Sequence, residues 1–273
     1  MNLKTFQELF KISESVISAN AITNLNKYLD SMQKGINSKL FFLNLIQTDC
    51  IVDFGCADGY LLETIRKYKP NLKLIGYDID NRMINILKKK KTDIFFTSDW
   101  EKVKDITNQY HRPTLLLSSV IHEVYSYGTS REIRMFWEKQ VFINNFHYIV
   151  IRDMVPSLKD MKYTPVYLNT IRKKSDPVQL KSFEDYWGKI NNSKTLLHWL
   201  LKYSYKENWK RELYENYLPI TIEELFSKIP SNWFKIYNKH YTYSFIKERI
   251  RKDYDVELEL PTHLKLILEN SLR

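Results

Sequence analysis

The 273-residue sequence contains only two cysteines, six glycines and eight prolines. Cys50 and Cys56 stand on either side of a predicted buried strand, which argues against a disulfide framework and against a zinc site. So few glycines and prolines exclude a long flexible linker. No stretch approaches about 18 consecutive apolar residues, and the N-terminal MNLKTFQELFKISES lacks the apolar run of a signal peptide. We therefore expect a cytoplasmic protein with no membrane partner.

Acidic residues are also in the minority, since 42 Lys and Arg exceed 32 Asp and Glu, a net charge of +10. An apolar fraction of 44% is typical of a folded chain, and the length suits one large domain or a domain with an elaboration. The positive charge is local. Residues 156–211 hold twelve Lys or Arg against five Asp or Glu, so +7 of the +10 falls within this block.

From position 50 onward, short apolar runs alternate with helical stretches. CIVDFG precedes the helical LLETIRKY, and LKLIGYD precedes the helical RMINILKKKK, which is the spacing of βαβ units. IFFTSDW, PTLLLSS and FHYIVIRD continue the alternation, with helices predicted over 100–109 and 130–144. Five strands separated by helices predict a parallel sheet covered on both faces.

The sequence divides into four predicted segments. Residues 1–47 show helical spacing and predict N-terminal helices, and residues 48–154 form the sheet core described above. Residues 155–229 lack a strand signal and contain the helix-like TLLHWLLKYSYKENWKRELYENY, so we expect a helical insertion that serves as a lid or an acceptor module. In 230–273, NWFKIYNKHYTYSF and THLKLILEN predict two closing strands with a charged helix between them.

The turn after the first strand carries the most specific pattern. The strand ends in Asp53-x-Gly55-x-Ala57-x-Gly59, and the chain then enters a helix. This arrangement brings backbone N–H groups and a helix N-terminus to the carboxyl edge of a parallel sheet, where ligands bind. Asp78 ends the second strand, where a carboxylate can accept both hydroxyls of a ribose. The turn is not G-x-G-x-x-G, and Asp53 would repel a pyrophosphate, which argues against NAD or FAD.

On these residues the sequence resembles the class I S-adenosylmethionine-dependent methyltransferases, with Ala57 in place of the middle glycine of their loop. The resemblance covers about 50–154 and recurs weakly at the closing strands. It implies a Rossmann-like α/β fold with a seven-stranded methyltransferase sheet, N-terminal helices and a helical insertion between strands five and six. It implies S-adenosylmethionine as cofactor, and it implies these cofactor contacts: Asp53, Gly55, Ala57, Gly59, Asp78, Met83, Asp99, Trp100 and Ser118.

Five of these contacts also have a purely structural interpretation. Gly55 and Gly59 could form a tight turn without a ligand. Asp78 and Asp99 could cap the helices that follow them. Trp100, beside a strand end, could be a core residue. Four signals in the order and spacing of the family favour the cofactor interpretation.

Candidate catalytic residues follow the fourth and fifth strands. His122 and Glu123 lie in SSVIHEVYSYG, and Asp153 ends IVIRD, so all three are placed near the methyl group. Methyl transfer depends mainly on alignment, and a base helps only an acceptor of high pKa. His122 is a candidate base, although it could line the pocket without taking a proton. Glu123 and Asp153 could instead form structural ion pairs. No further His or carboxylate stands at ligand spacing, so we expect no metal.

The basic block 156–211 admits two interpretations. Basic residues interleaved with aromatic rings suit an RNA acceptor, whose phosphates they neutralise and whose bases they stack. The aromatic residues of the block are Tyr163, Tyr167, Tyr186, Trp187, Trp199, Tyr203, Tyr205 and Trp209. The spacing of Leu196, Trp199, Leu200 and Tyr203, however, also describes a helix that buries one face. Rings on that buried face could not stack on bases.

Three functions remain open on the sequence alone. The first is a methyltransferase acting on RNA held by the basic, aromatic insertion. The second is a small-molecule O- or N-methyltransferase with the insertion as a lid. The third is a catalytically silent subunit of methyltransferase fold that serves a partner, against which the intact turn and Asp78 argue.

Overall fold

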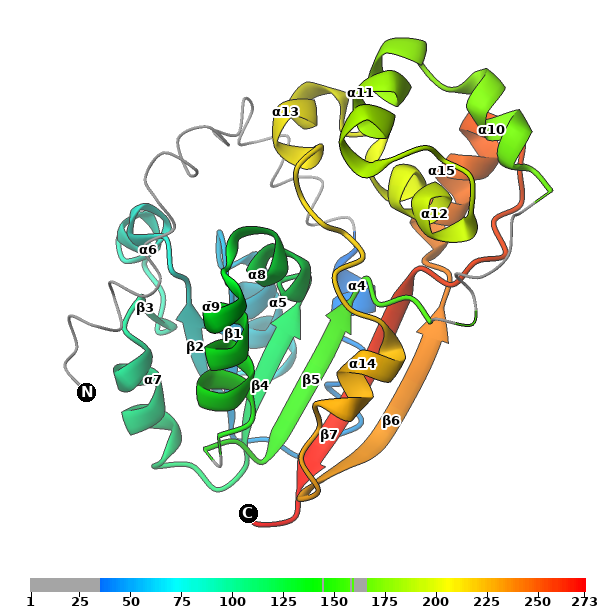
Figure 1. The fold of residues 1–273 in the computed structure, drawn as a ribbon. Coiled ribbons are helices and arrows are strands. Elements are labelled where there is room, and N and C mark those ends of the chain that lie inside the picture. The colour runs from blue at the N-terminus through cyan, green and yellow to red at the C-terminus, as the bar shows by residue number, and fades with distance from the viewer. Residues whose placement is uncertain (1–34, 144, 158, 160–165) are drawn as a thin grey trace.

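The computed structural model describes residues 35–143, 145–157, 159 and 166–273 (Figure 1). Its centre is a seven-stranded sheet in the order β3-β2-β1-β4-β5-β7-β6. The strands are β1 Cys50–Phe54, β2 Lys73–Tyr77, β3 Phe95–Thr97, β4 Pro113–Ser118, β5 Tyr148–Asp153, β6 Trp233–Tyr241 and β7 His263–Asn270. Strands β1 to β5 pair in parallel, and β7 runs antiparallel to both β5 and β6. The predicted fold is confirmed.

Helices cover both faces of this sheet and its carboxyl edge. Those that follow the first five strands or precede the sheet are α4 Ile36–Lys39, α5 Tyr60–Tyr68, α6 Asn81–Leu87, α7 Trp100–Thr107, α8 Ile121–Tyr127, α9 Ser130–Met135 and a π-helix Phe136–Val141. Those that follow β5 are α10 Leu168–Lys174, α11 Pro177–Trp187, α12 Ser193–Lys202, α13 Trp209–Glu212, α14 Ile222–Ser227 and α15 Ser244–Tyr254. A 3₁₀ turn, Lys206–Asn208, joins α12 to α13.

Alternation along the strands explains why both faces are covered. On β1, Val52 points to a core shared with Trp100 and Phe136, whereas Ile51 points to a core shared with Leu62. All five residues of β1 are buried, as the uninterrupted apolar run predicts for a central parallel strand. The sheet therefore has no wet face near β1, and ligands must approach from its carboxyl edge.

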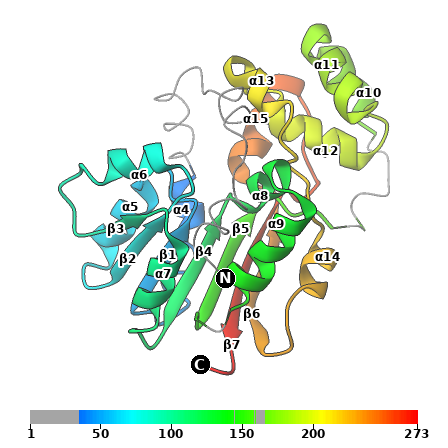
Figure 2. The same ribbon diagram turned by 60° about the vertical axis from the view of Figure 1, so that its left-hand side comes forward.

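Above that edge lies a third core, made by the inserted helices. Phe183, Trp199 and Leu200 pack with Ile250 of α15, and all four are fully buried. Figures 1 and 2 show α10 to α13 and α15 standing together over the carboxyl ends of β4 and β5. The helix α15, which precedes β7 in the sequence, thus completes the cap.

Local sequence signals set where these helices begin. Asp176 accepts from the backbone amides of residues 178 and 179 at the start of α11, with a proline in the first turn. Asn192 caps α12, and Thr221 forms a reciprocal capping box at α14. Such caps satisfy N–H groups that a helix leaves unpaired. They explain how a block without strands forms several short helices.

The segment boundaries predicted from sequence stay proposals. Within 155–229, helix α14 packs Leu225 into the core of the sheet and not into the cap, so the cap core draws on residues before about 219 together with α15. Of the N-terminal segment 1–47, only residues from 35 onward belong to the described part, which includes α4. No helix of the described residues combines the length and apolar character that crossing a bilayer requires.

Candidate active site

The turn between β1 and α5 is held in a strained, compact shape. Gly55, Ala57 and Gly59 have φ angles of 76°, 45° and 75°, a region that favours glycine. A Cβ atom on Gly55 would come within 2.8 Å of the Val120 side chain. The turn therefore needs glycine at position 55 for its backbone and for its close approach to Val120, at the start of α8.

Asp78 ties this turn to the end of β2. The amide of Ala57 donates to Asp78 Oδ2 at 2.9 Å, and the amide of Asp80 donates to Oδ1 at 2.9 Å. The amides of Gly55 and Cys56 both donate to the Tyr77 carbonyl. Several main-chain amides expected to face a ligand are thus used within the turn. Each oxygen of Asp78 keeps a further lone pair for a hydroxyl.

A small cavity opens beside this turn. Lys39, Asp53, Gly55, Tyr60 and Ser118 are among the residues that line it. The Ser118 hydroxyl is buried without a hydrogen-bond partner among the described residues. Asp53 is 3% exposed, and burial raises its pKa to about 7 although Lys39 acts in the opposite direction. Buried carboxylates with raised pKa values favour a ligand that brings positive charge or donors.

Burial likewise raises the pKa of Asp78 to about 6, opposed by the two amides that it accepts from. Together, Asp53 and Asp78 place two poorly solvated carboxylates at neighbouring strand ends. The structure therefore brings together at this edge most of the residues that the sequence proposed for the cofactor.

Three of the proposed cofactor contacts lie in less favourable positions. Asp99 caps α7 by accepting from the amide of Glu101, the alternative interpretation of its position. Trp100 is 3% exposed and packs edge-on against Tyr77 and Phe54 in the core. That burial gives Trp100 a packing role and lends no support to the predicted cofactor contact. Met83 is half-buried on α6.

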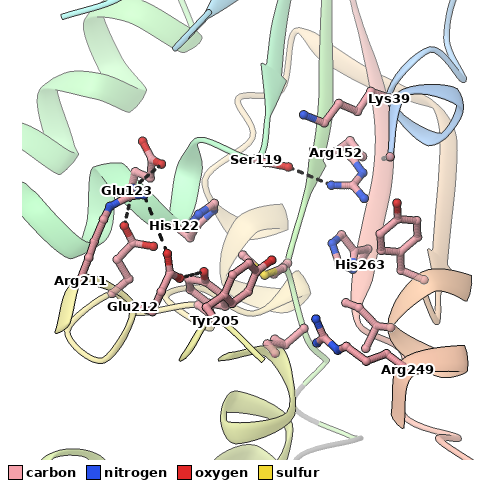
Figure 3. A pocket seen from close by; sticks show the side chains of 17 residues that line it. Lys39, Ser119, His122, Glu123, Arg152, Tyr205, Arg211, Glu212, Arg249 and His263 are labelled. Atoms are coloured by element: carbon pink, nitrogen blue, oxygen red, sulfur yellow. Dashed lines mark hydrogen bonds and ion pairs between the residues drawn. The ribbon is translucent and has the colours of Figure 1, made fainter. Parts of the chain in front are cut away.

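A larger cavity of about 150 Å³ lies between the sheet edge and the helical cap (Figure 3). Ser119, His122 and Arg152 line it from the sheet side. Tyr205 and Glu212 line it from the insertion, together with residues of α15. Lys39 lines both cavities, so the two spaces lie against the same side chain.

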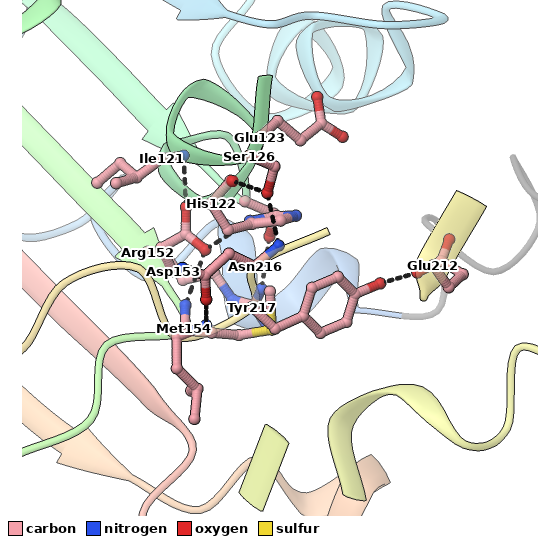
Figure 4. Close-up of polar contacts among 12 residues, drawn as sticks. Ile121, His122, Glu123, Ser126, Arg152, Asp153, Met154, Glu212, Asn216 and Tyr217 are labelled. Atoms are coloured by element: carbon pink, nitrogen blue, oxygen red, sulfur yellow. Dashed lines mark hydrogen bonds and ion pairs between the residues drawn. The ribbon is translucent and has the colours of Figure 1, made fainter. Parts of the chain in front are cut away.

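His122 stands at this cavity in a fixed orientation (Figure 4). Its Nδ1 lies 2.9 Å from Asp153 Oδ1. Asp153 also accepts from the amides of Ile121 at 2.7 Å and Met154 at 2.8 Å. Asp153 is 1% exposed and is not among the residues that line the cavity, so it positions His122 from behind. Its predicted catalytic role becomes one of orientation.

The charge of Asp153 decides the protonation of His122. Burial alone would lower the pKa of the imidazole, but the carboxylate and its hydrogen bond outweigh burial and raise that pKa to about 9. The pKa of Asp153 is correspondingly lowered, against the effect of its own burial. The pair is therefore an imidazolium and a carboxylate at neutral pH, and His122 becomes a base only when it loses that proton.

Acidic residues gather on the opposite side of the cavity around Arg211. Its guanidinium lies 3.1 Å from Glu123 Oε1, 2.6 Å from Glu215 Oε1 and 3.9 Å from Glu212 Oε1. Glu212 also accepts from the Tyr217 hydroxyl. Burial, with the charge of Glu215, raises the pKa of Glu212 to about 7. Glu123 thus forms an ion pair with Arg211 of the insertion. This is the structural alternative to a catalytic role that the sequence allowed for Glu123.

Several residues of the cavity escaped prediction because the fold, not a motif, brings them there. Lys39 precedes β1, Glu212 and Glu215 lie in the insertion, and Arg249 lies on α15. Arg152 was the one with a local signal, since it stands beside Asp153 at a strand end. A charged residue inside an otherwise apolar parallel strand is a mark of a site.

A family model described as a methyltransferase domain matches residues 26–207, about two thirds of the chain. The chain belongs to this methyltransferase family. It is an S-adenosylmethionine-dependent methyltransferase, and its cofactor is S-adenosylmethionine.

Among solved structures, the methyltransferase is similar to PH0226 protein from Pyrococcus horikoshii OT3, with 9% identity, 98% of this chain and 100% of that chain covered, and a TM-score of 0.48. It is also similar to the plantazolicin methyltransferase BpumL in complex with a pentazolic desmethylPZN analog and SAH, with 13% identity, coverage of 96% and 99%, and a TM-score of 0.44. A third is the methyltransferase domain of bacterial-CtHen1-C, with 12% identity, coverage of 87% and 97%, and a TM-score of 0.45. No curated protein matches this sequence.

Proposed function

We propose that this methyltransferase transfers the methyl group to a small acceptor enclosed between the sheet edge and the helical cap. The observation that carries the proposal is the larger cavity, which is lined from both sides. An acceptor held there would lie beside His122, close to the cavity at the glycine turn. The insertion then acts as a lid, the second of the functions left open by the sequence.

Burial of the aromatic rings weakens the alternative of an RNA acceptor. Trp199 is fully buried and Tyr203 is 7% exposed, and both pack in the cap core. Lys202 is also fully buried, with its ammonium over the Trp187 ring. The apolar residues spaced along α12 thus form a buried helix face, which is the second interpretation of their spacing. Among the aromatic residues proposed to stack on bases, Tyr186 does have an exposed ring, with 52% of its surface accessible.

The residues at the smaller cavity suit S-adenosylmethionine. Asp53 would face the cationic amino acid part, and Gly55 would allow close approach. Asp78, which ties the same turn to the end of β2, would accept from the ribose hydroxyls. The unpartnered Ser118 hydroxyl offers a further polar contact. When bound, S-adenosylmethionine supplies an electrophilic methyl group. The residues of this chain hold it in line with the acceptor and exclude water.

We assign to His122 the role of the base that takes up the proton released by the acceptor. Asp153 holds Nδ1, which leaves Nε2 as the nitrogen free to take a proton once it is neutral. Because the pKa of His122 is raised to about 9, the proposal predicts a rate that increases with pH up to that value. Full turnover by His122→Ala at all pH values would remove the histidine from this role.

The proposed acceptor class is tested by following the methyl group. Purified protein and radiolabelled cofactor are added to size-fractionated extracts, with nuclease and protease treatment as controls. Label in the low-molecular-mass fraction, insensitive to both enzymes, is the expected result. Label that nuclease releases from polymer, with binding that falls steeply as salt rises, would instead establish an RNA acceptor.

A further inference from the structure

Three cationic side chains gather on one side of the larger cavity, and they come from three separate elements. Lys39 belongs to α4, Arg152 to β5 and Arg249 to α15. Figure 3 shows them on the opposite side of the pocket from Glu123 and Glu212, with His122 between the two groups. We call these three residues the basic wall.

Arg152 is buried without an anion. It is 4% exposed, its Nη1 donates to the Ser119 hydroxyl at 2.8 Å, and its guanidinium lies 5.0 Å from the Tyr243 ring centre. Its Nε has no hydrogen-bond partner among the described residues. No described carboxylate lies within ion-pair distance of it. Ser119, which accepts from Arg152 Nη1, has a φ of 59°, so the backbone is strained where it meets this arginine.

Arg249 is held in a similar way. Its Nη1 donates to the Ser204 hydroxyl at 2.5 Å and its Nη2 to the Leu200 carbonyl at 3.0 Å. Its Nε is also buried without a partner in the described part of the chain. Neutral partners fix the position of both guanidinium groups, and the Arg249 guanidinium also lies 5.2 Å from the ring centre of Tyr203 and 5.8 Å from that of Phe245. No carboxylate of the described residues forms an ion pair with either arginine.

Among the described residues, the titratable groups around the basic wall leave the two arginines without a counter-charge at ion-pair distance. Burial and then Arg152 lower the pKa of Lys39, while Asp53, Asp58 and Asp153 act in the opposite direction from beyond ion-pair distance. Burial, Arg152 and then His122 lower the pKa of His263 on β7, so it stays neutral. The acidic groups facing the wall, Glu123, Glu212 and Glu215, are engaged by Arg211.

Burying the Arg152 cation without a carboxylate is costly, and Arg249 is half-buried with its Nε shielded from solvent. Guanidinium groups match oxyanions in two-pronged geometry. We infer that the basic wall binds an oxyanion of the acceptor, a carboxylate or a phosphate, between Arg152 and Arg249. This inference rests on the proposed function, since it gives the enclosed small acceptor an acidic group. The wall holds that group while the atom to be methylated lies toward His122.

The carboxylate of the cofactor is the competing source of an anion. Lys39 is the one member of the basic wall that also lines the smaller cavity. Arg152 and Arg249 line the larger cavity, on the acceptor side of Lys39. Variants of the two arginines should therefore affect the acceptor oxyanion and leave the cofactor alone.

The test uses inorganic phosphate and acetate as probes on the full chain saturated with S-adenosylhomocysteine. At constant ionic strength, at least one probe should raise the unfolding midpoint saturably. Arg152→Gln and Arg249→Gln should each weaken the binding of that probe by about tenfold or more. Arg251→Gln, an exposed arginine on the same helix as Arg249, serves as the matched control. Arg249→Gln keeps the test decisive if Arg152→Gln fails to fold.

Calorimetry with S-adenosylhomocysteine separates the outcomes. Unchanged affinity in both variants is expected, whereas a matching loss would assign the anion to the cofactor and overturn the inference. No saturable effect of either probe would overturn it as well. If the methyl label enters small molecules but not their acidic fraction, the proposed function stands and the inference fails. Phosphatase treatment of a labelled acidic product distinguishes a phosphate from a carboxylate.

Discussion

At the scale of single residues, the site depends on carboxylates that the fold holds out of water. Asp78 accepts two amides, from Ala57 and Asp80, and so joins the ends of two strands to the glycine turn. Asp153 accepts two amides and His122 in the same manner. Each carboxylate fixes the conformation of its loop by these hydrogen bonds, and that conformation positions the groups of the site.

Asp78→Ala should weaken binding of S-adenosylhomocysteine by about 1–3 kcal/mol, because it removes the acceptor of the ribose hydroxyls and frees the Ala57 amide. Titration calorimetry measures the change. Asp80→Ala, which removes the cap of α6 and the ion pair with Arg82 but keeps the backbone amide that donates to Asp78, is the control and should have a smaller effect. Equal affinity in the wild type and in Asp78→Ala would refute the placement of the ribose.

The His122–Asp153 pair should make stability depend on pH in a defined window. The folded pKa of His122, about 9, lies above the unfolded value of about 6.5, so the contribution is complete below about pH 6.5 and is lost as the pH rises through 9. We expect a loss on the order of 3 kcal/mol across that window. Denaturant unfolding at several pH values measures it. His122→Gln should flatten the profile, and an unchanged slope would contradict the assignment.

At the scale of elements, the strands were predictable because their alternation and their short apolar runs are local properties. The turn after β1 was predictable because few backbones satisfy positive φ at three alternating positions. The position of α15 in the cap was not predictable, since nothing in IKERIRKDY specifies that Ile250 packs on α12 and not on the sheet. The same holds for Arg249, which tertiary packing brings to the cavity that Arg152 lines.

The two interpretations of the aromatic insertion predict different effects on stability. Trp199→Ala should cost about 3–5 kcal/mol of unfolding free energy, because the ring is fully buried and donates to the Tyr254 hydroxyl. Tyr186→Ala, which truncates a ring that is 52% exposed, should change stability by no more than about 0.5 kcal/mol. Chemical denaturation measures both. A Trp199→Ala protein of normal stability would return this ring to the candidates for base stacking.

At the scale of the whole molecule, two cavities share Lys39 as a lining residue, one at the glycine turn and one beneath the helical cap. The net charge of +10 predicted little about the partner, because part of it is internal. Lys202 is buried in the cap, Arg172 pairs with Glu184, and Arg211 faces three glutamates. Composition reports how many charges a chain has, and only the fold reports which of them reach a ligand.

The central claim is that the cofactor binds at the turn between β1 and α5, with the acceptor next to it under the cap. A crystal structure of the protein with S-adenosylhomocysteine tests this most directly. We predict density for the ligand beside Gly55 and Ser118, with its ribose on Asp78 and its sulfur facing the cavity that contains His122. Density for the ligand at any other place, with the turn still closed by its own side chains, would contradict the account.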